Sequence, residues 1–224
     1  MKKTFLTICV ILCLATLVFT ATACQKTPEP EATEPISYMQ QSFYMGKTKD
    51  FTARLTGGVS ETLFVADGVT RDVRPFCTLT LVPQHVDLFN EPYTFTLKGD
   101  KGEVSGAMDK DSFGASYSTE IPSLDGVGTP QEVTVKSDKI EQTIPLTNML
   151  ADSVAASRAL ELAKANLEAK LTASAKDREI YVKYINDAES DTSDYYWYVA
   201  FIASPTDYFA VLISPQGEIV SVNP

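Results

Sequence analysis

The sequence predicts two folded domains: an all-β sandwich of immunoglobulin-like type, followed by an α+β domain with one helix on an antiparallel sheet. Three observations carry this prediction. Short β-prone runs separated by turn residues fill residues 38–150. One helix-forming stretch with a single apolar stripe opens residues 151–224, and further β-prone runs follow it. A helix packed on one face of an antiparallel sheet is the simplest way to bury the apolar stripe of the helix and the apolar face of the sheet.

Residues 1–23 have the three-part layout of a secretory signal. Two lysines precede an apolar run over residues 5–19, and small residues lead up to Cys24. The Cys at this place resembles that of a bacterial lipoprotein box, which receives diacylglycerol and becomes the new N-terminus. The box here carries Ala21 where Leu is usual. We therefore expect an extracytoplasmic protein anchored to the membrane by a lipid on Cys24, with ordinary secretion and an uncleaved anchor as alternatives.

Residues 24–37 are expected to form a tether between the lipid and the first domain. Pro and Glu dominate residues 25–36, and the apolar residues show no periodicity. At about 3.1 Å per residue, such a segment would hold the domain some 30 to 40 Å from the membrane.

The charge of the chain narrows the range of partners. The full sequence has 19 basic and 29 acidic residues, a net charge of −10. Removal of the signal takes away two lysines and no acid, which leaves 17 basic and 29 acidic residues and a charge of −12. Such a surface repels nucleic acid and anionic lipid headgroups. We expect no nucleic-acid partner, membrane attachment through the lipid, and a neutral or cationic protein partner.

Nine β-prone runs make up the first predicted domain, residues 38–150. Gly57-Gly58, Asp67-Gly68, residues 98–102 and Asp125-Gly126 supply turn signals between them. The paired Cys and Trp of true immunoglobulin domains are absent, so this sandwich is predicted from the strand pattern alone. The runs are SFYMG, DFTARLTG, ETLFVADG, FCTLTLVP, YTFTLKGD, GEVSGAMD, GASYSTEI, EVTVKSD and QTIPLTN.

The second predicted domain begins with a helix over about residues 152–172. This stretch lacks Gly and Pro, and its apolar residues recur at three-and-four spacing. Asp152 or Ser153 is expected to cap the first turn. The stripe consists of Ala156, Leu160, Ala163, Leu167 and Leu171.

Strands are predicted over residues 179–186, 195–204 and 207–214, with a turn over residues 214–217 and a final strand over 218–222. The order of helix and strands, the aromatic start Trp197-Tyr198-Val199 and the ending VLISPQGEIV resemble the PepSY domain family. Ser214 and Gln216 depart from the Asp and the small residue usual in that ending. The resemblance implies a binding or inhibitory role toward peptidases, in propeptides or in envelope proteins of Gram-positive bacteria. It implies no catalytic residue and no cofactor.

Both faces of the middle predicted strand are apolar or aromatic. Trp197, Val199 and Phe201 lie on one side, and the alternate residues from Tyr196 to Ile202 on the other. One helix covers one face, so the other must meet the first domain, a loop or a partner. The aromatic residues of these strands are candidates for partner binding, with a core or interdomain role as the alternative. The candidates are Tyr196, Tyr198, Tyr208 and Phe209.

Few side chains offer catalytic or metal-binding chemistry. The only histidine, His85, lies in a loop-like stretch, which excludes histidine triads and two-histidine zinc motifs. Cys77 is the one cysteine in the body of the protein if Cys24 is lipidated, and we expect it to be buried and inert. It has a disulfide partner only if Cys24 is not lipidated. We assign no catalytic and no metal-binding residue.

Two acidic stretches are open to a calcium interpretation. Residues 187–194 place acids at the alternate spacing that begins a calcium loop, but Thr192 replaces the usual Gly and Tyr198 the closing Glu. Asp109 and Asp111, near Asp100, form a looser set. We expect solvated turns at both. Paired carboxylates of a glycoside hydrolase are a further alternative, although no stretch singles out such a pair.

The expected function is that of a non-catalytic, membrane-anchored binding protein. Its C-terminal domain is expected to contact another extracytoplasmic protein, such as a peptidase that it modulates or inhibits. The alternative is a structural or solute-sensing envelope lipoprotein without a peptidase partner, which a pocket between the two domains would favour.

Overall fold

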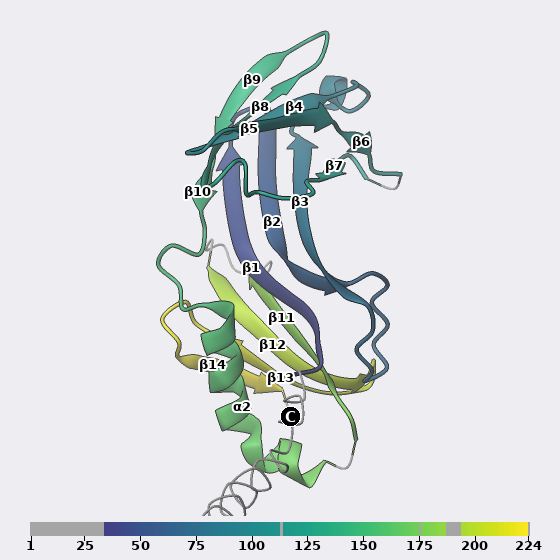
Figure 1. Ribbon diagram of the computed structural model, residues 1–224, viewed down its shortest axis with the longest axis vertical. Helices are drawn as coiled ribbons and strands as arrows, with labels where there is room; N and C mark the ends of the chain where they lie inside the picture. The colour runs from purple at the N-terminus through teal and green to yellow at the C-terminus, as the bar shows by residue number, and fades with distance from the viewer. Residues whose placement is uncertain (1–33, 113, 175, 187–193, 224) are drawn as a thin grey trace, which may run out of the picture. The chain divides into compact units, whose positions relative to one another are not determined.

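The computed structural model describes residues 34–112, 114–174, 176–186 and 194–223. These form two β-sheets, one α-helix and a short 3₁₀ helix (Figure 1). The predominance of strand with one helix agrees with the coarse fold prediction. The elements are β1 (Ile36–Lys47), β2 (Phe51–Glu61), β3 (Val73–Pro83), η1 (Val86–Leu88), β4 (Thr94–Gly99), β5 (Glu103–Ala107), β6 (Asp109–Lys110), β7 (Tyr117–Glu120), β8 (Pro130–Lys136), β9 (Glu141–Pro145), β10 (Thr147–Asn148), α2 (Ala156–Ala173), β11 (Glu179–Asn186), β12 (Tyr195–Ser204), β13 (Asp207–Ile213) and β14 (Ile219–Asn223).

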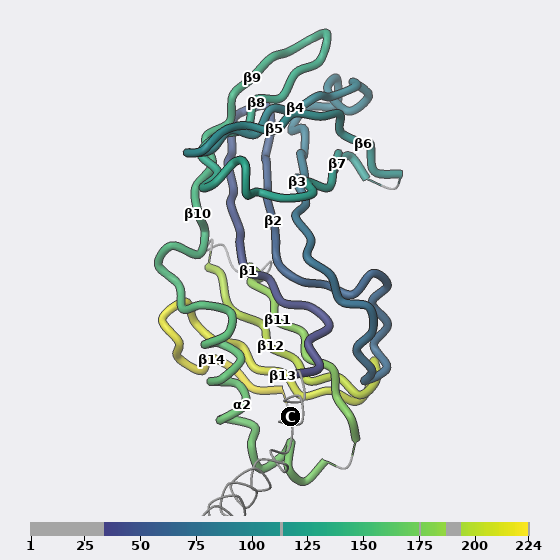
Figure 2. Tube along the Cα trace, in the orientation of Figure 1, coloured from purple at the N-terminus to yellow at the C-terminus, as the bar shows by residue number. Residues whose placement is uncertain are grey.

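The larger sheet contains strands from both predicted domains. Its strand order is β14-β13-β12-β11-β1-β2-β3-β7-β6, and the short strand β10 also pairs with β1. β1 and β11 run parallel, with Met39 opposite Val182, and all other described pairings are antiparallel. Figure 2 traces β1 between β2 and β11. Residues 35–224 form one compact unit. The division of this unit into two domains near residue 150 stays a prediction.

The first core lies between the smaller sheet, β5-β4-β8-β9, and the part of the larger sheet formed by β2, β3 and β7. Buried side chains from both sheets form one cluster, as a two-sheet arrangement requires. Three aromatic rings are central to it: Tyr93 meets Phe51 at 5.5 Å and Tyr117 at 4.8 Å between centroids, edge to face in both cases. The Tyr93 hydroxyl donates to the Leu88 carbonyl at 2.9 Å, which fixes η1 against this core.

Two local predictions in this part of the chain are wrong. Gly57 and Gly58 lie inside β2 and not in a turn. At Gly58 a side chain would collide with the Met39 carbonyl of β1, so glycine is needed there for the close approach of the two strands. The run of residues 61–68 is a loop after its first residue, and Leu63 is 82% exposed. Beyond this run, the Arg71 backbone N–H donates to Glu61 Oε1 and so ties the loop back to the last residue of β2.

The second core lies between α2 and one face of β11, β12 and β13, with side chains of β1 completing it. Trp197, Val199 and Phe201 all point into it, as the predicted alternation requires. The predicted bounds of β11 and β12 are confirmed, and the stripe from Ala156 to Leu167 is buried.

The predicted cap of the helix is wrong. α2 begins at Ala156, and its N-cap residue Ala155 has no side-chain hydrogen bond. Ser153 instead accepts a hydrogen bond from the Trp197 indole N–H at 2.9 Å. A buried indole N–H needs an acceptor, and the Ser153 hydroxyl and the Val154 carbonyl both serve this one.

We predict that Leu167→Ala lowers the free energy of unfolding by about 2 to 5 kcal/mol, since it opens a cavity beneath a helix held mainly by packing. Leu167 is 2% exposed. Urea unfolding followed by fluorescence of Trp197, which lies in the same core, measures the change. Exposed Glu161 on the same helix provides the control, and Glu161→Ala should change stability by less than about 0.5 kcal/mol. Equal effects of the two substitutions would contradict this packing.

Candidate functional site

Tyrosines line the face of β11, β12 and β13 that points away from α2. Tyr181, Tyr198 and Tyr208 stand one on each strand, and Tyr38 of β1 pairs with Tyr181 across the parallel ladder. Because side chains alternate along a strand, all lie opposite the face that contains Trp197. We call these four residues the tyrosine face.

Ring contacts run along this face from β1 to β12. The Tyr38 and Tyr181 rings stack with their centroids 4.7 Å apart, and Tyr198 meets Tyr181 edge-on at 6.4 Å. Phe64, in the loop between β2 and β3, lies 5.5 Å from Tyr181. The loop therefore covers one end of the tyrosine face. At the other end Tyr208 remains 36% exposed.

Burial raises the pKa of three tyrosines of this face, Tyr38, Tyr181 and Tyr198. It raises the pKa of Tyr181, and at Tyr198 the nearby Tyr208 and Tyr181 raise the pKa further. Burial, aided by Tyr181, also raises the pKa of Tyr38. The three hydroxyls therefore stay protonated at physiological pH. They serve as hydrogen-bond donors and acceptors and not as phenolate bases.

A hollow of about 250 Å³ lies at the exposed end of the tyrosine face. Tyr198 and Tyr208 line it together with Ala210, and Ser221 and Asn223 of β14 add polar groups. It is smaller than the usual 300–1,000 Å³ of a pocket for a small molecule. Its size suits one or two side chains of a partner protein better than a whole ligand.

The predicted binding residues do not all share this face. Tyr198 and Tyr208 do; Tyr196 follows the same alternation along β12 but lines a separate hollow with Pro215 and Gln216. Phe209 lies on the helix side, where it packs against the second core. Neighbouring residues of a strand point to opposite faces, so Tyr208 and Phe209 cannot belong to the same surface of the sheet.

A buried arginine holds Phe209 in place. The Arg178 guanidinium lies 4.2 Å from the centre of the Phe209 ring and donates to Asp207 Oδ1 at 2.7 Å. It also donates to the carbonyls of Phe201 and Asp207, so it joins both strands of the β12–β13 hairpin. Hydrogen bonds from Lys176 and then Arg178 lower the pKa of the Asp207 carboxyl.

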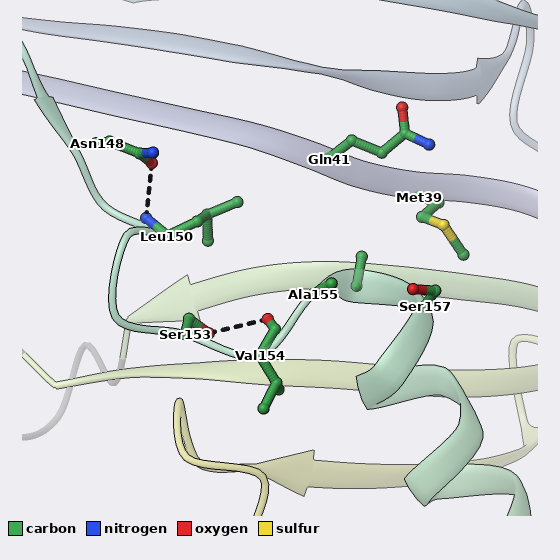
Figure 3. A pocket seen from close by; sticks show the side chains of 9 residues that line it. Met39, Gln41, Asn148, Leu150, Ser153, Val154, Ala155 and Ser157 are labelled. Carbon is green, nitrogen blue, oxygen red and sulfur yellow. Dashed lines mark hydrogen bonds between the residues drawn. The ribbon is translucent and has the colours of Figure 1, made fainter.

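A second hollow, of about 370 Å³, lies where β1 and β10 approach the start of α2 (Figure 3). Gln41, Asn148, Ser153 and Ser157 line it with polar groups. The first N–H groups of α2 receive no side-chain cap from Ala155. The positive end of a helix dipole and these polar groups favour a polar or anionic occupant.

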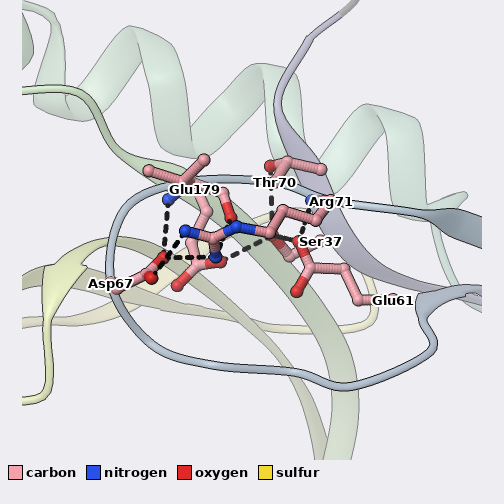
Figure 4. A network of polar contacts seen from close by, with 7 residues as sticks. Ser37, Glu61, Asp67, Thr70, Arg71 and Glu179 are labelled. Carbon is pink, nitrogen blue, oxygen red and sulfur yellow. Dashed lines mark hydrogen bonds and ion pairs between the residues drawn. The ribbon is translucent and has the colours of Figure 1, made fainter.

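Buried polar side chains meet at the start of β1 (Figure 4). Ser37 Oγ lies 2.7 Å from Glu179 Oε2, 3.1 Å from Glu61 Oε1 and 3.1 Å from Thr70 Oγ1. Ser37, Glu61 and Glu179 are at most 5% exposed. The Arg71 backbone N–H donates to Glu61 Oε1 at 2.5 Å. We call Ser37, Glu61, Thr70 and Glu179 the buried carboxyl cluster.

The sequence predictions missed this cluster. They placed Ser37 in the tether, whereas β1 begins at Ile36. Ser37 is 24 positions from Glu61 and 142 from Glu179, so no local pattern connects them. The available signal was an acidic residue at the end of each of two apolar strands.

The structure also shows the surroundings of His85 and Cys77, which the sequence analysis considered for catalytic chemistry. The His85 ring is about half exposed, with Nε2 3.5 Å from Asp50 Oδ1. Cys77 is buried as predicted, and burial raises its pKa to about 11, which leaves little reactive thiolate at neutral pH.

No three His, Cys, Asp or Glu side chains gather into a metal-binding group within the described ranges. No helix in those ranges is long and apolar enough to span a bilayer. Cys24 and residues 187–193 lie outside them.

No family model, curated protein or solved structure matches this chain. The resemblance to PepSY domains therefore remains a prediction.

We predict that Asp207→Asn destabilises the protein at pH 7 and that the difference from wild type shrinks as the pH falls below about 4. The carboxyl has a lower pKa in the folded chain than in the unfolded one. Its stabilisation is therefore full above the unfolded value of about 3.9 and is lost as the pH falls through the folded value. Urea midpoints across this pH range, with exposed Asp138→Asn as control, provide the measurement. A difference independent of pH would contradict the role of the charge.

Proposed function

We propose that this chain is a non-catalytic binding protein outside the cytoplasmic membrane, held there by a lipid on Cys24. Its C-terminal part, residues 151–224, is proposed to be a PepSY-like module that binds another extracytoplasmic protein. A peptidase that it modulates or inhibits is the partner class we favour. Residues 38–150, an immunoglobulin-like sandwich in this proposal, act as a spacer.

The observation that carries the proposal is the exposed end of the tyrosine face. Tyr198 and Tyr208 border a hollow that neither α2 nor the loop between β2 and β3 covers. Tyrosine is enriched where proteins bind each other, because its ring buries apolar area while its hydroxyl forms hydrogen bonds. The hydroxyl of Tyr198 stays protonated, as such a contact requires.

The arrangement of α2 supports the same proposal. The helix lies on one face of β11, β12 and β13 and leaves the other face to different contacts. This is the helix-and-sheet order in which the sequence resembles PepSY domains. The charge of −12 expected after signal removal favours a neutral or cationic surface on the partner.

We predict that Tyr208→Ala weakens partner binding about 10-fold or more, since it removes one wall of the hollow. Tyr198→Phe, which removes only a hydroxyl, should have a smaller effect. The immobilised chain, residues 25–224, would be used to capture partners from an envelope extract of the source organism, with peptidase activity assayed beside it. Affinities of the variants would then be measured by surface plasmon resonance.

Val86→Ala is the matched control, because Val86 is 80% exposed and lies on η1, away from the tyrosine face. It should bind as wild type does. Recovery of a peptidase whose activity is unchanged by the chain would contradict modulation. Equal binding by Tyr208→Ala and Val86→Ala would contradict the tyrosine face as the site.

One observation favours the second candidate function, solute sensing. The hollow at the start of α2 joins residues of both predicted domains, and its volume falls within the range for small ligands. We predict that, if this function holds, a small polar or anionic solute raises the unfolding temperature by about 2 °C or more at saturation.

A thermal-shift screen of carboxylates, phosphate and amino acids measures this effect. Ser157→Phe should abolish the shift by filling the hollow, whereas Tyr208→Ala should retain it. A shift that survives Ser157→Phe would place the solute elsewhere, and a screen without any shift would remove this candidate.

A further inference from the structure

The Ser37 hydroxyl makes three oxygen–oxygen contacts at hydrogen-bond distance, but the hydroxyl groups present supply protons for only two of them. The Ser37 hydroxyl lies within 3.1 Å of oxygens of Glu61, Thr70 and Glu179. Ser37 and Thr70 supply one hydroxyl proton each, and an ionised carboxylate supplies none. Two protons serve two of the three contacts. The third contact requires another positive species.

The remaining carboxyl oxygens of the cluster point to the nature of that species. Glu61 Oε2 and Glu179 Oε1 are buried and have no hydrogen-bond partner among the described residues. A buried oxygen without a partner is strongly unfavourable. One extra proton would complete the third contact at Ser37 and still leave both of these oxygens without a partner. A metal ion satisfies the contact and the two oxygens together, because it coordinates several oxygens at once.

The charges near the cluster match a divalent cation. Glu61, Glu179 and Asp67 carry three formal negative charges, and Arg71 carries one positive charge. The Arg71 guanidinium donates to Asp67 at 2.8 and 2.9 Å and forms no ion pair with either buried glutamate. The formal charge of this group is therefore −2.

The donor atoms favour calcium over other metals. Two carboxylates and two hydroxyls are hard oxygen ligands, which exclude metals that prefer nitrogen or sulfur. Magnesium usually keeps several bound waters, and the side chains of Ser37 and Glu179 are fully buried. Calcium accepts irregular arrangements of six to eight oxygens at about 2.3 to 2.6 Å. Oxygens spaced 2.7 to 3.1 Å apart, as around Ser37, fit neighbours in such a shell.

We propose that the buried carboxyl cluster is a binding site for a calcium-type divalent cation, with Glu61 Oε2 and Glu179 Oε1 as the anchoring ligands (Figure 4). The site has two carboxylates, and Ser37 and Thr70 complete its side-chain ligands. It is separate from the acidic stretches that the sequence singled out. The bound cation links β1, β2, β11 and the loop of residues 62–72. Because Phe64 of this loop contacts Tyr181, the cation orders the covered end of the tyrosine face.

The test is calcium titration of the chelator-treated chain, residues 25–224, by calorimetry and by thermal unfolding. We expect a dissociation constant on the order of 10⁻⁴ to 10⁻³ M, the range of extracellular calcium modules. Saturation should raise the unfolding temperature by about 3 °C or more. Magnesium at the same concentration should have a much smaller effect.

Glu61→Gln and Glu179→Gln should each abolish the calcium-dependent shift. Without calcium, both should unfold at or above the temperature of metal-free wild type, because a neutral amide removes a buried charge and adds an N–H donor. Two variants are the controls and should retain the full shift: Glu218→Gln, at an exposed residue, and Asp191→Asn, in the acidic stretch of residues 187–194.

Two results would overturn the site. Wild type without heat or thermal shift up to 10 mM calcium would show that no cation binds, and the wild-type titration decides this whether or not the variants fold. Calcium binding that survives both glutamine substitutions, or that is lost in Asp191→Asn, would place the ion elsewhere.

Discussion

The parallel pairing of β1 with β11 is the contact on which the larger sheet depends. It joins a hairpin near the start of the chain to strands some 140 residues later, and the hydrogen bond between Ser37 and Glu179 lies where it begins. Closing so long a loop is entropically costly, so strong interactions are needed at the junction. Met39 and Phe43 of β1 supply them by completing the core under α2. Without this pairing, the sheet would divide between the two predicted domains.

The strands that β1 recruits are apolar on both faces, and the two faces have different contacts. One is covered by α2 and contains Trp197, whose indole N–H donates to Ser153 and Val154 just before the helix begins at Ala156. The other is covered at one end by Phe64 and is open at Tyr208. The second face keeps an exposed end because a single helix lies on one side of the sheet only.

The loop of residues 62–72 connects the two features to which we assign roles. Its Thr70 contacts Ser37 in the buried carboxyl cluster, and its Phe64 contacts Tyr181 on the tyrosine face. A change in the charge balance of the cluster therefore acts on the loop that covers part of the tyrosine face. In the extracytoplasmic location that we propose, calcium reaches concentrations that a site of modest affinity detects. In our proposals, ion binding and partner recognition are thus coupled through one short segment.

Local sequence patterns were sufficient to predict the elements of the C-terminal part. Alternation and helical periodicity depend only on neighbouring residues, so the bounds of β11 and β12 and the buried stripe of α2 were predictable. Alternation also places Tyr208 and Phe209, both predicted as binding candidates, on opposite faces of the sheet. Only the tertiary structure decided that Gly58 lies within a strand, that the two predicted domains share a sheet, and that Ser37, Glu61 and Glu179 meet. These outcomes depend on close approach and pairing between distant segments, which no local pattern records.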